Sequence, residues 1–434
     1  MTVTAEELSV FAASFNPANW FDGVRAHTAV YRDERIYELE MERIFHSSWV
    51  YVGHESEIAE PGDYRLVRVG RQRMLLVRGH DGAIRLLRNR CTHRGTELCQ
   101  APSGNANAFR CHYHGWTFHN TGELVGVSFP DGYPGGTAKH GRDLWSAPRL
   151  DSYRGFVFAS LRPDVPALRE HLGPATDYID GYVDHAGGRE LCVDACAHTS
   201  RYRGNWKLQV ENGVDGYHAN FTHSSFFAVM QRRTGKQSRY IVQEEGGCTR
   251  DLGHGHVVLD QSEVAGEVLS RRLATLPGFD GLSAERLGLV EDEYRALLEA
   301  NAGPGYNLSV FPNLQLIGIH IREIEPVAVD ETVITLKPLM IKAAPPAING
   351  LRRRYHELFW GPAGFGTPDD LEMLGRVHDG NRPVDGWVSF ERGTHRLENG
   401  DHGPRAAITD EVPQRGLYSQ WAALLSQPFT AGRK

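Results

Sequence analysis

The sequence has 434 residues and a formal net charge of −7, and 41% of its residues are hydrophobic and 23% charged. A chain of this length exceeds one ordinary hydrophobic core, so we expect two domains or one large domain with an insert. The composition is that of a globular protein, and the absence of an extended Lys/Arg cluster argues against a nucleic-acid partner.

Neither the N-terminus nor the apolar runs predict a targeting or membrane segment. The start, MTVTAEELSVFAASF, lacks a basic region followed by an apolar run. No uninterrupted apolar stretch approaches the roughly 18 residues of a membrane helix. The 6 cysteines are too sparse for a disulfide framework in so long a chain. We therefore expect a cytoplasmic protein whose free thiols point to metal.

The first two predicted segments differ in their hydrophobic pattern. Residues 34–46, ERIYELEMERIFH, have apolar positions at helical spacing and predict a helix. From Trp49 the chain changes to short β-rich runs, such as DYRLVRVG and RMLLVRG, separated by Gly or Asp-Gly turns. Residues 48–165 therefore predict an all-β domain, and residues 1–47 an arm of the domain that follows it.

Residues 166–434 predict a mixture of helices and strands. Helical patterns occur in DVPALREHLGPATDYIDGYV, NWKLQVENGVDGYHANFTHSSFF, PAINGLRRRYHELFWG and PDDLEMLGRVHDG. Strands are expected near CVDACAHTSRY and in YNLSVFP, LQLIGIHIREIEP and ETVITLKPLMIKA. Helices together with an antiparallel sheet predict the α+β class, with the all-β domain inserted into it.

Two Cys/His knuckles lie in the stretch CTHRGTELCQAPSGNANAFRCHYHGWTF, with the spacing C-x-H-x17-C-x2-H. Cys91 and His93 form the first knuckle, and Cys111 and His114 the second. A zinc ion with two Cys and two His is one interpretation. A [2Fe–2S] cluster is favoured because the ligands fall in loops of a β domain, C-x-H is unusual for a zinc finger, and Gly follows each knuckle. Imidazole on one iron raises the reduction potential of such a cluster.

This is the Rieske motif, and nearly the whole chain resembles the large (α) subunit of Rieske non-haem iron aromatic-ring-hydroxylating oxygenases. The resemblance implies that Cys91 and Cys111 hold one iron of the cluster and that His93 and His114 hold the other. It also implies a helix-grip catalytic domain around a mononuclear iron. Trp116 would pack against the cluster loop, or belong to an ordinary core.

The second candidate site lies in ENGVDGYHANFTH, which contains Asp215, His218 and His223. Histidines five apart point away from each other on a regular α-helix, so they converge only with a bulge or a helix end between them. Alone, the two histidines are better explained as one surface and one core histidine than as metal ligands. A cluster that stores one electron needs an acceptor, and iron held by two His and one carboxylate leaves positions open for O2.

The carboxylate is expected in GPAGFGTPDDLEML, at Asp369 or Asp370. With Thr367 as N-cap and Pro368 at the first helical position, acids in the first turn also suit the helix dipole. The family pattern of a G-P-A-G segment before a D-D pair places the ligand at Asp370. Asp215 would instead hydrogen-bond the cluster histidine of a neighbouring subunit, which corresponds to His114, and support a ligand histidine.

The resemblance implies a terminal oxygenase that receives electrons from NAD(P)H through a ferredoxin or flavin reductase and acts in aromatic catabolism. It implies a trimer of α subunits, alone or as α3β3 with a small β subunit. Alternatives are a hydrocarbon dioxygenase, a monohydroxylase or O-demethylase of the same architecture, and a Rieske electron carrier without a second metal.

Two features favour cis-dihydroxylation of an aromatic carboxylate. The motif E-N-x-x-D-x-Y-H resembles the benzoate-like branch, whereas hydrocarbon-type members carry one more residue between Asn and Asp. Arg322 lies in a predicted strand, on the face of His320, Leu316 and Leu314, where a guanidinium can hold a carboxylate in a bidentate pair. An ion pair of Arg322 with Glu323 or Glu325 is the alternative. Further positions that match the family pocket, or are candidates for it, are Asn212, Trp360, Gly366 and Arg405.

Overall fold

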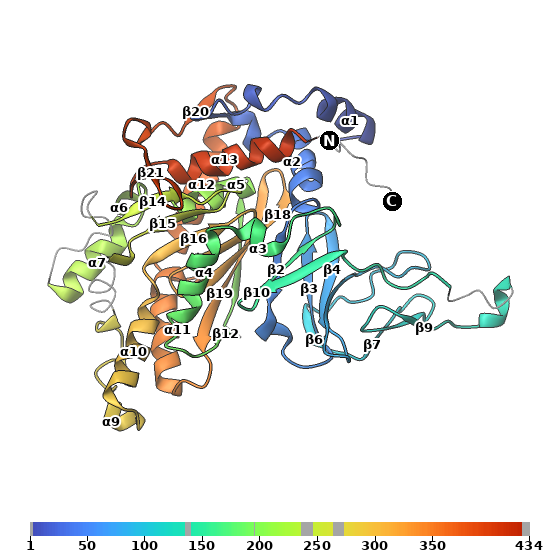
Figure 1. Ribbon diagram of the computed structural model, residues 1–434, viewed down its shortest axis with the longest axis horizontal. Helices are drawn as coiled ribbons and strands as arrows, with labels where there is room; N and C mark the ends of the chain where they lie inside the picture. Colours follow the sequence, from blue (N-terminus) through green and yellow to red (C-terminus); the bar gives the residue numbers. More distant parts are fainter. Residues whose placement is uncertain (1–2, 135–139, 195, 236–245, 264–272, 428–434) are drawn as a thin grey trace. The chain divides into compact units, whose positions relative to one another are not determined.

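The computed structural model describes residues 3–134, 140–194, 196–235, 246–263 and 273–427. The chain separates into two compact units, Phe45–Leu168 and the combination of Met1–Ile44 with Arg169–Lys434 (Figure 1). The first unit is inserted into the sequence of the second. The sequence predicts this insert at 48–165. The architecture is α+β, as expected, with an all-β unit and a unit that combines antiparallel strands with helices.

The described residues of the all-β unit form three small antiparallel sheets. Buried positions recur among partly buried ones in DYRLVRV, where Tyr64, Val67 and Val69 are buried, and β-branched and aromatic residues at such positions favour strands. The sheet orders are β5-β4-β3-β6, β10-β11-β2 and β7-β8-β9. The bounds are β2 Val50–His54, β3 Asp63–Val69, β4 Gln72–Arg78, β5 Ile84–Arg88, β6 Ser103–Asn105, β7 Ala108–Arg110, β8 Thr117–His119, β9 Leu124–Gly126, β10 Arg149–Tyr153 and β11 Phe156–Ser160.

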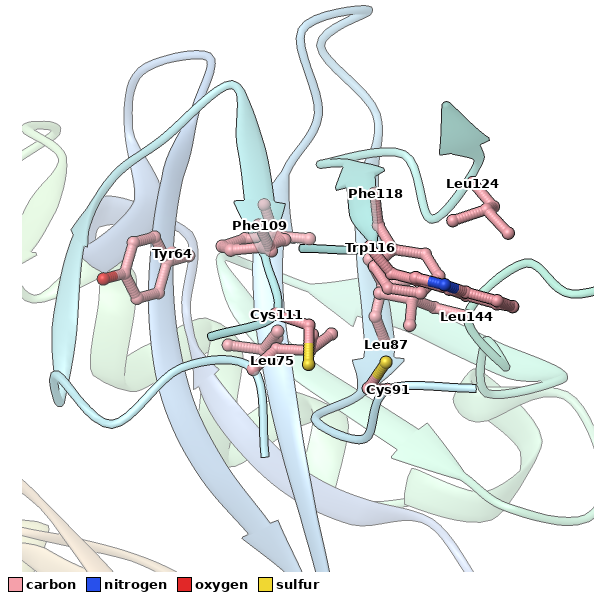
Figure 2. Packing of buried hydrophobic residues seen from close by; sticks show 12 residues of the cluster. Tyr64, Leu75, Leu87, Cys91, Phe109, Cys111, Trp116, Phe118, Leu124 and Leu144 are labelled. Atoms are coloured by element: carbon pink, nitrogen blue, oxygen red, sulfur yellow. The ribbon is translucent and has the colours of Figure 1, made fainter. Parts of the chain in front are cut away.

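The core of this unit includes both cysteines of the two knuckles. Cys91 and Cys111 are buried among Leu75, Leu87, Phe109, Trp116 and other apolar side chains, and Figure 2 shows their sulfur atoms beside these rings and leucines. The partly buried Cys99 packs against the same cluster, in accord with its interpretation as a small apolar residue.

The second unit is built on one large antiparallel sheet, which has ten strands among the described residues. Its order is β12-β19-β18-β17-β16-β15-β14-β22-β21, and β13 also pairs with β19. The bounds are β12 Leu191–Val193, β13 His198–Arg203, β14 Cys248–Asp251, β15 Val257–Asp260, β16 Tyr306–Val310, β17 Leu314–Ile317, β18 His320–Ala328, β19 Glu331–Ile341, β21 Glu398–Gly400 and β22 Gly403–Ala407. A separate short ladder joins β1 Arg25–His27 to β20 Trp387–Ser389.

Helices pack on this sheet (Figure 1): α5 contacts β16, β17 and β18, α11 contacts β19, and α13 contacts β14 and β15. The helices are α1 Ala5–Ser14, α2 Glu34–Glu40, α3 Leu168–Leu172, α4 Ala175–Asp184, α5 Trp206–Gly213, α6 Ala219–Thr222, α7 Ser224–Thr234, α9 Ala284–Leu287, α10 Glu291–Ala302, α11 Pro346–Trp360, α12 Thr367–Asn381 and α13 Val412–Leu425. The expected helix over 34–46 consists of α2 followed by a π-helical turn, Met41–Phe45.

The stretch LQLIGIHIREIEP is a hairpin rather than one continuous strand. Gly318, at φ +57°, and Ile319 turn the chain between β17 and β18, and glycine adopts this left-handed backbone without strain. Arg322 pairs with Gln315, and His320 with Ile317. Arg322 therefore shares a face with His320, Gln315 and Ile317, and its expected alignment with Leu314 and Leu316 was wrong.

The N-terminal arm is attached through a completely buried ion pair. Lys207 on α5 pairs with Glu40 on α2, and neither side chain is exposed. The indole N–H groups of Trp206 and Trp421 also donate to the Glu40 carboxylate, at 2.8 and 2.7 Å. Sequence segments at both ends of the chain therefore meet at one buried charge.

Replacing Lys207 with Met is expected to destabilise this unit by about 3–5 kcal/mol, because the variant leaves an uncompensated buried carboxylate. The shift in the unfolding midpoint in denaturant measures the loss. Lys342→Met is the control, since Lys342 pairs with Glu190 at 2.6 Å on the surface and such pairs contribute about 0–1 kcal/mol. Equal midpoints for the two variants would contradict the structural importance of the buried pair.

Candidate active site

The two Cys/His knuckles adopt the same hydrogen-bonded backbone turn. In each, the cysteine carbonyl accepts from the glycine N–H four residues later, and the cysteine N–H donates to the carbonyl five residues later. The four distances are Gly95 N to Cys91 O 2.9 Å, Gly115 N to Cys111 O 2.9 Å, Cys91 N to Thr96 O 2.8 Å and Cys111 N to Trp116 O 2.7 Å. Both glycines have positive φ, +85° and +71°, which explains why glycine follows each knuckle.

The side chains of the knuckles converge on one place. The rings of His93 and His114 lie 4.6 Å apart, and His93 stacks on Trp116 at 4.8 Å with an interplanar angle of 10°. Nδ1 of His93 is buried without a hydrogen-bond partner among the described residues. Two buried thiols beside two imidazoles, one of them with an unpartnered nitrogen, fit a [2Fe–2S] cluster with two Cys and two His ligands.

Backbone amides act on both thiols of the knuckles, but only one of the two pKa values is lowered overall. Burial raises the pKa of the Cys91 thiol. Burial also acts against the Cys111 thiolate, but the N–H groups of Tyr113 and His114 donate to its sulfur, and its pKa is lowered overall. The loop therefore already stabilises negative charge on sulfur, as metal ligation requires.

The second site forms where three helical segments meet. His218 immediately precedes α6, and His223 stands between α6 and α7. This short helix with an end at each histidine turns the two rings toward each other, as the five-residue spacing demanded. Nε2 of His223 lies 3.2 Å and Nε2 of His218 lies 3.5 Å from Oδ1 of Asp370.

Asp370, rather than Asp369, faces the histidines. Asp370 is buried, with 7% of its surface exposed, whereas the Asp369 side chain is 39% exposed and lies 3.8 Å from Nδ1 of His223. One ligand atom each from His218, His223 and Asp370 lies within 4.8 Å of the other two, so the group fits one cation.

Thr367 is not the N-cap of α12, contrary to expectation. The helix begins at Thr367 with Gly366 as N-cap, and the Thr367 hydroxyl donates to the carbonyl of Trp360 at 3.0 Å. The hydroxyl therefore hydrogen-bonds a carbonyl at the end of α11 rather than a backbone N–H at the start of α12. The N-cap lies one position earlier than predicted, and Asp370 still lies on the inner face of the helix.

Neighbouring polar groups make the site strongly negative. Nδ2 of Asn212 donates to Asp370 at 3.2 Å and lies 3.4 Å from Nε2 of His218. Asp215 lies 3.4 Å from Nδ1 of His218. Burial alone would lower the pKa of His218, but Asp215 and Asp370 raise it to about 10. Because the apo site favours a positive charge this strongly, it suits a metal cation.

A cavity of about 120 Å³ opens beside these residues. Its polar end includes Asn212, Asp215, His218, His223 and Asp370. Its walls include an aromatic group that the sequence interpretation missed, Phe226, Phe227 and Phe359. The adjacent letters FF and LFW were the only signal for these side chains, and any apolar core produces the same pattern.

Arg322 also lines this cavity. It is 3% exposed, its Nε is buried without a partner, and it has no ion pair among the described residues. The expected alternative partner Glu323 pairs instead with Lys337 at 2.5 Å. Burial lowers the pKa of Arg322, and the charge of Asp370 opposes that shift.

The other expected pocket residues are distributed differently. Trp360 lines the cavity. Gly366 lies behind the wall, because a Cβ placed there would come 2.3 Å from the ring of Phe359. Arg405 lines a different cavity, and it pairs with Glu398 at 3.0 Å.

Gly366→Ala is therefore expected to displace Phe359 into the cavity and to reduce kcat/KM, while the cluster stays intact. Overpacking of this kind costs about 1–3 kcal/mol, or roughly 5- to 150-fold in kcat/KM if it falls on substrate binding. Steady-state kinetics on variant and parent measure it. Gly350→Ala is the control, since its Cβ would meet only the end of Arg354, at 3.7 Å. An unchanged kcat/KM in Gly366→Ala would show that Phe359 does not bound the substrate.

Comparison with known proteins agrees with this architecture. Residues 48–135 match the Rieske [2Fe-2S] domain model, and residues 189–427 match the model of the ring hydroxylating alpha subunit (catalytic domain). The chain is 34% identical to the 2-halobenzoate 1,2-dioxygenase large subunit of Burkholderia cepacia, over 88% of this chain and 83% of the relative. It is 35% identical to the toluate 1,2-dioxygenase subunit alpha of Pseudomonas putida, over 88% and 84%. The crystal structure of naphthalene 1,2-dioxygenase from Rhodococcus sp. bound to indole superposes with a TM-score of 0.74 at 27% identity, over 98% of this chain and 99% of that one.

Fold and sites thus define a Rieske non-haem iron oxygenase. The chain belongs to the family of ring-hydroxylating oxygenase α subunits. Its cofactors are accordingly a [2Fe–2S] cluster and a mononuclear iron, supplied with electrons from NAD(P)H through a reductase. No helix in the described ranges is long and apolar enough to cross a bilayer.

Proposed function

We propose that this chain is the catalytic subunit of a dioxygenase that adds both atoms of O2 to the ring of a monocyclic aromatic carboxylate. His218, His223 and Asp370 would hold the mononuclear iron. Cys91, His93, Cys111 and His114 would hold the Rieske cluster. The observation that carries the substrate class is Arg322, a buried cation in the wall of the cavity that contains the triad. Arg322 forms no ion pair with any residue that the structure describes.

An unpaired buried cation is costly, so its presence calls for an anionic partner. A carboxylate that enters the cavity would meet the guanidinium in a charge-assisted, bidentate pair. The wall also carries aromatic side chains, among them Phe226, Phe227 and Phe359, which suit the ring. The relatives named for 2-halobenzoate and toluate are consistent with this chemistry.

The volume of the cavity favours a single ring. An engineered protein cavity of about 150 Å³ holds benzene, so the 120 Å³ here is of the size of one ring and small for two fused rings. The Rhodococcus naphthalene dioxygenase structure keeps a hydrocarbon substrate as the second candidate. That candidate requires the cavity to expand and leaves Arg322 without a role.

In this proposal the residues of the chain bind, orient and exclude water. When bound, the mononuclear iron supplies the site at which O2 is activated. Arg322 anchors the carboxylate and so fixes which ring edge faces the triad. Phe226, Phe227 and Phe359 surround the ring and displace water. Asn212 and Asp215 hold Asp370 and His218 in orientation.

We further propose that Asp215 connects the triad to a cluster histidine, His114, of a neighbouring subunit. That arrangement implies a trimer of α subunits, alone or with a β subunit, served by a ferredoxin or flavin reductase. The names of the relatives as large or alpha subunits support a multi-component enzyme. Free thiols at all 6 cysteines are consistent with action in the cytoplasm.

A turnover panel with labelled O2 tests the proposal. The iron-reconstituted protein, reduced with a surrogate reductase, receives benzoate, toluate and anthranilate beside benzene and naphthalene, and mass spectrometry counts the labelled atoms. Two labelled atoms in a carboxylate product are expected. Turnover of hydrocarbons alone would refute the carboxylate assignment, and a single labelled atom would make the protein a monohydroxylase.

A further inference from the structure

A second group of histidines lies outside the triad, where the sheet meets α11. His198 is on β13, His320 on β18 and His356 on α11. The rings of His198 and His356 lie 5.6 Å apart, and those of His320 and His356 lie 5.0 Å apart. All six ring nitrogens are buried and none makes a hydrogen bond of ordinary geometry among the described residues, although the Trp360 carbonyl lies close enough to His198 to oppose the lowering of its pKa. Unsatisfied buried polar atoms at this density call for a ligand.

Three side chains of this region offer atoms at metal-binding separation. One nitrogen each of His198 and His356 and one carboxylate oxygen of Glu357 lie within 4.8 Å of one another. This is the same limit that the triad of His218, His223 and Asp370 satisfies. Two imidazoles and a carboxylate are a common ligand set for zinc, with water in the fourth position. His320, although it is a neighbour, does not belong to this group.

The local charges are compatible with a cation. Burial lowers the pKa of His356 to about 3 and also lowers that of His198, so burial favours the neutral imidazole, which is the form that binds a metal, at both rings. Glu357 supplies a negative charge, and α11 ends at Trp360, so its C-terminal dipole also favours a cation. Arg322 opposes a cation here, because its charge contributes to the lowered pKa of both histidines.

We propose that His198, His356 and Glu357 form a second metal site, for a divalent transition-metal ion such as Zn²⁺. The ion would connect the start of β13 to the last turn of α11. Trp360, four residues after His356, stacks on the His356 ring at 6.0 Å and lines the substrate cavity. The site would therefore stiffen one wall of that cavity. The proposal does not depend on the identity of the substrate or on the iron ligands.

Metal counting tests the proposal on the full chain. The protein is stripped with a chelator, reloaded with Zn²⁺ and freed of excess metal, and zinc is counted per chain by mass spectrometry, with cluster iron counted separately. Parent protein is expected to hold about two zinc ions, one in the triad and one in the new site, because a complete set of His and carboxylate ligands binds one ion. His198→Gln and His356→Gln should each lose one of them. His320→Gln, equally buried but outside the group, should keep both.

The comparison of parent and variants decides the proposal, and the visible spectrum of the cluster shows which variants are folded. His198→Gln and His356→Gln variants that hold as many zinc ions as the parent would show that water fills this region, whether the parent holds one ion or two. Chelation provides a second readout, since an ion that binds only the folded state raises its stability. A chelator should lower the melting temperature of the parent more than that of His356→Gln, and equal shifts would contradict the site.

Discussion

Asp370→Ala is expected to abolish turnover and to release the mononuclear iron, while the red-brown Rieske cluster remains. Asp370 supplies the only carboxylate oxygen within 3.5 Å of both histidine Nε2 atoms among the described residues. Replacing residues that merely hydrogen-bond a metal ligand costs about 10–100-fold in affinity or activity, so loss of the ligand itself should cost more than about 100-fold. Iron analysis with the visible spectrum of the cluster separates the two metals.

Asp369→Ala is the matched control in the same helical turn. Its carboxylate is 39% exposed and approaches His223 only at 3.8 Å, on the ring nitrogen that faces away from Asp370. This variant should retain its iron and most of its turnover. The reverse outcome, with iron lost from Asp369→Ala and kept in Asp370→Ala, would show that Asp369 is the iron ligand and that the assignment to Asp370 is wrong.

Arg322→Gln is expected to raise KM for aromatic carboxylates by about 30-fold or more, since truncating one side of a buried charge pair costs about 2–5 kcal/mol. Neutral analogues such as the corresponding aromatic amides should be affected far less. Steady-state kinetics on both substrate series measure the difference. Arg405→Gln should leave both series unchanged, because Arg405 pairs with Glu398 away from this cavity.

Folding stability gives Arg322→Gln a second readout. A buried guanidinium without a counter-ion destabilises the empty protein, so its removal should leave the melting temperature unchanged or raise it. A lowered melting temperature together with equal losses for carboxylates and amides would make Arg322 a structural residue, and the carboxylate assignment would fail with it.

Local spacing was sufficient to predict most of the architecture. The knuckles required backbone turns that only glycine adopts easily, and Gly95 and Gly115 occupy those positions. The five-residue gap between His218 and His223 required a bulge or a helix end, and α6 provides a helix end at each histidine. Such features depend on a few consecutive residues, and so the sequence reveals them.

Register and packing over long distances were not accessible in the same way. The hairpin at Gly318 changed which residues share a face with Arg322, since one turn within a presumed strand reassigns every side chain beyond it. The N-cap of α12 lies one position before the predicted Thr367, and the Thr367 hydroxyl donates instead to a carbonyl at the end of α11.

The sequence by itself determined the class of protein, both ligand motifs and the order of the domains, because motif spacing and hydrophobic period are local properties of the chain. The residues alone left Asp369 and Asp370 open, and the family pattern favoured Asp370. Only the tertiary structure showed that Asp370 faces the histidines, that Arg322 has no ion pair among the described residues, that Arg405 lies elsewhere, and that His198 and His356 meet. The contacts of Asp370 with the histidines and of His198 with His356 join residues more than a hundred positions apart, and no local pattern encodes which partners a folded chain brings together.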